Sequence, residues 1–251
     1  MPVIKEIDLA LAAIRGKQPR LKLYRDYFRG DQRLAFATAK YRTTFGDLFT
    51  EFADNVCSGV INTLADKLII EGMGNTATGQ RAWALWGDLK LQRRAGQIHQ
   101  EGLLCGGSFL IIWPAPRAKT PVFYVNKAEH IYIHYSQDDP TLIEWGAKMW
   151  LETDGAIRLT MYYADRIEKY TTAPKAPSTS TSRAFKPLEV IGEAWPLINP
   201  YGRVPIFHFA NNAFPGEAGI SELAAVIPLQ DAINKTATDL MVAMEYVALP
   251  Q

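Results

Sequence analysis

The closing segment 220–251 constrains the fold of this 251-residue chain more than any other feature. Ser221 follows Gly219 as a good helix N-cap, and apolar residues then recur at helical spacing for about thirty residues, or roughly 45 Å of rise. Helices of globular domains average about a dozen residues, so the preceding domain is too small to cover this apolar face. We therefore expect the helix to pack against copies of itself or a partner helix, through Leu223, Val226, Leu229, Ile233, Leu240 and Met244.

The first part of the chain, residues 1–106, has the apolar periodicity of helices. The strongest pattern runs from Thr44, a predicted N-cap, to Leu68, and its apolar stripe is expected to bury against a large surface and to form the core of its domain. Phe52 lies in that stripe, so Phe52→Ala should cost about 3–5 kcal/mol. The other predicted helices cover residues 4–14, 18–34 with a break at Gly30, 79–89 and 91–105 with an end at Gly106-Gly107.

From Ser108 onwards the apolar period changes to two, which predicts a mostly β region over residues 107–219. Asp154-Gly155 is a hairpin turn signal, and the Pro/Ser/Thr-rich tract at about 172–187 is predicted to be a mobile loop. Helices followed by a largely antiparallel sheet define an α+β fold. The predicted strands are 108–113, 122–126, 130–136, 142–152, 156–163, 166–172, 188–195 and 204–210.

Composition indicates an ordinary globular protein, with 48% hydrophobic and 21% charged residues and a net charge of +1. The charge is uneven, because residues 1–50 carry ten Lys or Arg against five Asp or Glu, whereas 220–251 carries one Lys against four acids. The N-terminus lacks a signal-peptide pattern and no apolar run reaches the ~20 residues of a membrane span, so we expect a cytoplasmic protein. Cys57 and Cys105 are expected to be buried thiols, although a disulfide stays open.

The sequence matches no catalytic template. No phosphate-binding glycine loop is present, and His99 with Cys105 lacks the second ligand pair of a zinc site. We therefore predict a non-enzymatic protein with no catalytic residue, metal site or cofactor.

A basic stretch near the N-terminus alternates with Tyr24, Tyr27 and Phe28. One interpretation is contact with phosphates or aromatic rings of a partner. The other is a solvated face whose charges pair with neighbouring acids. The candidate contact residues are Arg15, Lys17, Arg20, Arg25, Arg29 and Arg33.

Several stretches, in this order over nearly the whole chain, together resemble the siphophage-type portal proteins of tailed double-stranded DNA bacteriophages. They are DYFRGDQRL, KYRTTFGDLFTEFADNVCSGVINTLADKLIIEG, HQEGLLCGGSFLIIWP, MYYADRIEKY, NPYGRVPIFHFANN and GISELAAVIPLQDAINKTATDLMVAMEYVALPQ. The resemblance implies a structural virion protein, assembled in the host cytoplasm into a ring of typically twelve subunits at one capsid vertex. Its implied partners are terminase, capsid and scaffolding proteins, a head-tail adaptor and double-stranded DNA that passes through unread.

The resemblance also implies a division of the chain. Residues 1–219 would form the wing and 220–251 the first stem helix. The clip, second stem helix and crown of the family are then expected to be missing here, either because the chain is truncated or because its remainder was not resolved. Asp231, Lys235 and Asp239 are candidate channel-facing residues, since acids would repel the DNA backbone, and the basic stretch would contact a neighbouring subunit or the capsid.

Two other classes of function remain open from the residues. One is the N-terminal part of a DNA-processing enzyme whose catalytic half lies downstream, and the other is a DNA-binding module that uses the basic stretch. The module predicts tight, salt-sensitive binding by the monomer.

Overall fold

The computed structural model describes residues 2–32, 55–114 and 121–248. The chain divides into two compact units, which are described one at a time. Unit 1 contains residues 1–21 and 106–219, and unit 2 contains residues 22–105 and 220–251. Helices and antiparallel sheets confirm the predicted α+β class.

Helix α1 (Pro2–Arg29) contributes residues to both units. The sequence pattern predicted two helical segments here, but the structure has one helix of 28 residues with Pro19 inside it. Proline has no N–H, so the carbonyl of Arg15 loses its usual donor four residues on. The helix ends, as predicted, at Gly30, whose φ of 81° suits glycine.

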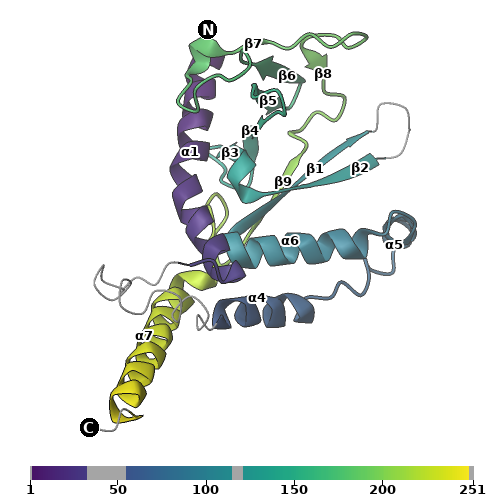
Figure 1. The fold of residues 1–251 in the computed structure, drawn as a ribbon. Coiled ribbons are helices and arrows are strands. Elements are labelled where there is room, and N and C mark those ends of the chain that lie inside the picture. The colour runs from purple at the N-terminus through teal and green to yellow at the C-terminus, as the bar shows by residue number, and fades with distance from the viewer. Residues whose placement is uncertain (1, 33–54, 115–120, 249–251) are drawn as a thin grey trace. The chain divides into compact units, whose positions relative to one another are not determined.

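Unit 1 holds two antiparallel sheets (Figure 1). The larger has the order β3-β4-β5-β6-β7, with β8 paired to β6, and the smaller has the order β2-β1-β9. Seven of the eight predicted strands are confirmed. The strand bounds are β1 Gly107–Pro114, β2 Pro121–Asn126, β3 Ile131–Tyr135, β4 Ile143–Leu151, β5 Ile157–Tyr163, β6 Arg166–Thr171, β7 Lys186–Pro187, β8 Leu197–Ile198 and β9 Ile206–Ala210, and the short 3-10 helices are η1 Ala128–His130 and η2 Ser182–Ala184.

The core of unit 1 lies between α1 and the larger sheet. Ile7, Ala10 and Leu11 occupy one face of α1, because residues three and four apart lie on the same side of a helix. They pack with buried side chains of the sheet, among them Leu159 and Met161 of β5. The sheet thus buries an apolar face against the helix.

The Pro/Ser/Thr-rich tract is tied to α1 at several points. The carboxylate of Asp8 accepts hydrogen bonds from Ser182 N at 2.8 Å and Ser182 Oγ at 2.7 Å. Phe185 is buried in the core, so the tract buries more than its composition suggested. Its predicted mobility stays a prediction.

The strand predicted at residues 188–195 is wrong. The amide of Glu193 donates to the carbonyl of Val190, and Gly192 between them has a φ of 85°. That backbone conformation makes a turn, which the alternation of apolar residues does not reveal.

Unit 2 consists of helices in its described part: the end of α1, α4 (Val56–Lys67), α5 (Ala77–Asp88), α6 (Leu91–Cys105) and α7 (Leu223–Ala248). The predicted helix from Thr44 to Leu68 is shorter than expected, because Asn55 is an N-cap whose side chain accepts from Ser58 N. Thr44 and Phe52 lie outside the described residues. α7 has 26 residues, fewer than the thirty expected.

The predicted stripe of α4 is only partly buried. Cys57 and Ile61 are buried, whereas Val56, Leu64 and Leu68 are exposed. Helical periodicity shows which residues share a face but does not show how wide a strip the neighbours cover. The described part of the stripe is therefore covered on one side only, and the core expected around Phe52 stays a prediction.

Leu159→Ala should lower the free energy of unfolding by about 2–5 kcal/mol, because the side chain is 0% exposed and truncation leaves a cavity. Leu151→Ala is the matched control, since Leu151 is 69% exposed on the neighbouring strand, and its cost should be within about 0.5 kcal/mol. Urea denaturation measures both. Equal losses would contradict the placement of the core.

Candidate functional site

Helix α7 has three distinct faces. The buried residues Gln230, Asn234 and Thr238 lie four apart on the face turned into unit 2. The charged residues Lys235 and Asp239 lie on a second, exposed face. The third face is exposed and apolar, with exposed fractions from 43% at Ile233 to 87% at Val247, and its members are Leu229, Ile233, Leu240, Met244 and Val247.

The buried face of α7 is a hydrogen-bonded network. The Gln230 side chain accepts from Val56 N, the first amide of α4, at 2.8 Å and donates to Asn234 Oδ1 at 3.1 Å. Asp231 accepts from the Tyr27 hydroxyl at 2.6 Å. Burial, and then the Asp231 carboxylate, raise the pKa of Tyr27, so the hydroxyl keeps the proton that it donates.

The predicted packing residues of α7 therefore differ in burial and lie on different faces of the helix. Leu223 is buried within unit 2 and Val226 is half-buried, whereas Leu229, Ile233, Leu240 and Met244 are exposed. Sequence reasoning missed the polar buried face. Its signal was present as Gln230, Asn234 and Thr238 at a spacing of four, but polar residues are normally assigned to the solvent side.

The candidate channel-facing residues are also separated. Asp231 is bonded to Tyr27, whereas Asp239 accepts from Lys235 Nζ at 2.6 Å on an exposed face. About 80° of helix rotation lies between the two acids at 3.6 residues per turn, so they do not form one acidic stripe. Whether either acid faces a channel stays a prediction.

Three of the five basic candidates that the structure describes make contacts inside the chain. Arg15 donates to the carbonyl of Ser180 at 2.7 Å, and Lys17 donates to the carbonyl of Ile131 while its Nζ lies 5.4 Å from the ring centre of Phe109. Arg25 pairs with the half-buried Glu101 at 2.6 Å.

The contact of Arg25 supports the interpretation of charges paired with neighbouring acids, whereas Arg15 and Lys17 bond backbone carbonyls instead. Arg20 and Arg29 are exposed, and Arg33 lies outside the described residues. A contact with another subunit or the capsid stays a prediction, best tested at Arg20 and Arg29. Reversing the charge of Arg25 would instead disturb the subunit itself.

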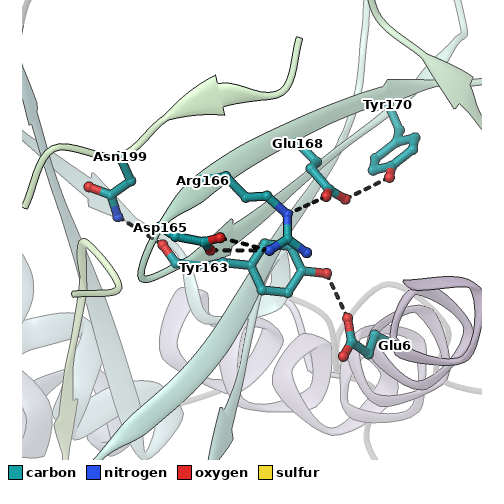
Figure 2. Close-up of polar contacts among 7 residues, drawn as sticks. All are labelled: Glu6, Tyr163, Asp165, Arg166, Glu168, Tyr170 and Asn199. Carbon is teal, nitrogen blue, oxygen red and sulfur yellow. Dashed lines mark hydrogen bonds and ion pairs between the residues drawn. The ribbon is translucent and has the colours of Figure 1, made fainter. Parts of the chain in front are cut away.

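A cluster of charged and aromatic residues joins α1, β5 and β6 (Figure 2). Glu168 is buried, and its carboxylate accepts from Arg166 Nε and the Tyr170 hydroxyl, each at 2.7 Å. Arg166 lies 4.2 Å from the ring centre of Tyr163, whose hydroxyl donates to Glu6 at 2.6 Å. The guanidinium also bonds both oxygens of Asp165 at 3.1 Å, and Asn199 donates to the Tyr163 carbonyl at 2.8 Å.

This cluster is built to stabilise unit 1. The carboxylates of Glu6, Asp165 and Glu168 each accept a hydrogen bond from Tyr163 or Arg166, so they are satisfied within the chain. The described residues contain no group of three His, Cys, Asp or Glu arranged to hold a metal ion. The cluster therefore fixes the sheet to α1 rather than presenting a reactive group.

Strand β9 of the smaller sheet carries a half-buried histidine. His208 stacks on Phe109 with ring centres 4.6 Å apart, and its Nδ1 lies 2.7 Å from the Tyr135 hydroxyl. Burial, with a smaller contribution from Lys17, lowers the pKa of His208 to about 4. The ring is therefore neutral near pH 7.

Comparison with known proteins gives the family. A family profile described as "Phage portal protein, SPP1 Gp6-like" matches residues 66–250, which is most of the chain and includes α7. The chain belongs to this family of phage portal proteins, a structural rather than an enzymatic class. A search of curated proteins found no match. In the described part of the chain, no helix is both long and apolar enough to cross a membrane.

Arg166→Met should lower the free energy of unfolding by about 2 kcal/mol, because it leaves the buried Glu168 carboxylate with a weaker set of donors. In Arg166→Met/Glu168→Leu the cost should be smaller than the sum of the single changes, since the stranded charge is removed. Chemical denaturation of the four proteins measures this coupling. Additive effects would show that the pair contributes nothing beyond separate packing.

Stability should fall on acidification through His208. Its pKa is lower in the folded chain than the unperturbed value of 6.5, so between about pH 6.5 and 4 the unfolded state binds more protons. The contribution is fully present above that window and declines as pH falls, by on the order of 1–3 kcal/mol. In His208→Phe the unfolding free energy should change less with pH across this window. An unchanged pH dependence would contradict the assignment.

Proposed function

We propose that this chain is the subunit of a portal ring at one capsid vertex, through which double-stranded DNA is packaged and ejected. The family match over residues 66–250 supports the class of function. The exposed apolar face of α7 is the observation that carries the proposal for a ring. In this proposal residues 1–219 are the wing and 220–251 the first stem helix.

The apolar face of α7 has the properties of a helix-packing surface. Leu229, Ile233, Leu240, Met244 and Val247 lie within about 60° of one another around the axis, since each step of three, four or seven residues returns to the same side. Val247 is 87% exposed in the single chain. Burying such side chains fully contributes about 1.5–3 kcal/mol each, which favours a partner at this face.

A ring follows if the partner face is a different surface of the next copy. Contacts between unlike surfaces repeat head to tail and close when the rotation between copies permits it. Twelve copies is the number that the resemblance implies. We propose that α7 packs on the neighbouring subunit through this face.

The charged face of α7 is our candidate for the channel. The ion pair of Lys235 and Asp239 is neutral overall, so this face binds DNA phosphates only weakly. A channel wall that binds phosphates weakly lets the DNA slide past it. Asp231 accepts a hydrogen bond from Tyr27, so the proposal rests on Lys235 and Asp239 rather than on Asp231.

Other surfaces of the subunit would bind the partner proteins of the ring. We propose that terminase and a head-tail adaptor dock on the assembled ring, and that capsid and scaffolding proteins surround it in the virion after assembly in the host cytoplasm. Arg20 and Arg29 are exposed and suit contact with a neighbouring subunit or the inner capsid wall. DNA passes through without sequence recognition.

Leu240→Asp should abolish or strongly weaken oligomers, because it places a carboxylate in the middle of the apolar face. The free energy of unfolding of the subunit should stay within about 0.5 kcal/mol, since Leu240 is exposed in the single chain. Light scattering and electron micrographs of purified protein measure the assembly.

The control is Lys235→Gln, which alters the charged face of the same helix and should leave rings intact. Rings of normal size in Leu240→Asp would exclude this face as the subunit contact. A wild-type protein that stays monomeric at all concentrations and with DNA-packaging partners present would contradict the ring itself.

A further inference from the structure

The anchoring of α7 is interrupted by a proline. Its first turn is fixed, since Leu223 is fully buried, Ser221 Oγ donates to the carbonyl of Leu104 at 2.6 Å, and Glu222 N donates to the carbonyl of Leu103 at 3.0 Å. Pro228 follows inside the helix and has no N–H. The carbonyl of Ala224 therefore loses its helical donor, and the helix is weakest at this point.

The hydrogen-bonded network stands just beyond that weak point. Gln230 reaches the first amide of α4, and Asp231 reaches the hydroxyl of Tyr27 near the end of α1. A third bond, from Asn55 Nδ2 to the carbonyl of Phe28 at 3.0 Å, joins α4 to α1. We call these five residues the α7 junction: Tyr27, Asn55, Val56, Gln230 and Asp231.

We propose that Pro228 is a hinge and that the α7 junction is the latch that fixes the direction of the helix beyond it. Two anchors on either side of a flexible point determine the direction of a rod, whereas the first anchor alone leaves it free to swing. The second anchor is polar, and hydrogen bonds are directional where apolar contacts are not. The latch therefore sets where the apolar and charged faces of α7 point.

The composition of the buried face supports a latch rather than a permanent core. Gln230, Asn234 and Thr238 occupy positions where most helices bury Leu or Ile. A satisfied polar contact contributes modestly to stability but is costly to leave half-made. Such hydrogen bonds are therefore either formed together or broken together, which is what a switch between two directions of the helix requires. This inference goes beyond the proposed function and does not depend on ring formation.

Spin labels on the full-length chain test the latch within unit 2. Cysteines replace Leu240 on α7 and Gln97 on α6, both exposed, while the native Cys57 and Cys105 are buried and should not take up label. Labelled chains are mixed with an excess of unlabelled chains, so the distance is read within one chain whether or not rings form. Pulsed electron spin resonance gives the distribution of label-to-label distances.

The wild-type background should give one narrow distance. The double variant Gln230→Met/Tyr27→Phe removes the Val56–Gln230 and Tyr27–Asp231 hydrogen bonds while side-chain volume stays nearly constant. It should give a broad or multiple distribution of distances. Adding Pro228→Ala restores the missing backbone donor and should return the distribution to a single narrow distance. Lys235→Met, which breaks an ion pair on the exposed face, is the matched control and should leave the distance narrow.

Three results would overturn the proposal. They are a broad distribution in the wild-type background, a narrow one in the latch variant, or broadening that Pro228→Ala does not reverse. If the latch variant does not fold by circular dichroism, Tyr27→Phe alone is measured, and it must broaden the distribution to a lesser degree. None of these results depends on rings, so a failed latch leaves the proposed function standing.

Discussion

The bond between the Gln230 side chain and the first amide of α4 is the contact on which the arrangement of unit 2 depends. A helix begins with amides that have no partner within the helix, and Gln230 satisfies one of them from another element. The same side chain is buried and bonded to Asn234, so α7 is joined to α4 by a donor and an acceptor that must both be aligned. This alignment turns the apolar face of α7 outward.

Unit 1 and unit 2 are each stabilised internally by a different kind of contact. In unit 1, Ile7 and Leu11 pack on Leu159 and Met161, and a buried charge cluster around Glu168 reinforces that core. In unit 2, α7 beyond its first turns buries the side chains of Gln230, Asn234 and Thr238, while apolar side chains from Leu229 to Val247 are exposed on another face. A chain that folds alone usually does the reverse. The difference is what a subunit needs if it is to complete its burial only on assembly.

Local patterns predicted much of the fold because their causes are local. The turn at Asp154-Gly155 and the helix end at Gly106 follow from glycine conformations that neighbouring residues do not change. Alternation identified seven strands for the same reason. It failed at 188–195, where Gly192 turns the chain. The helix predicted from Thr44 is confirmed from Val56, where Asn55 caps α4, and its earlier part lies outside the described residues.

The sequence by itself determined the α+β class, the family and the existence of an apolar face on the closing helix, because composition and period encode which residues share a side. Only the tertiary structure decided which side is buried. It assigned Asp231 to Tyr27, Arg25 to Glu101 and Gln230 to Val56, pairs that lie far apart in the chain. Helical spacing fixes angles within one helix, but the partner of each side chain depends on what the rest of the chain brings beside it.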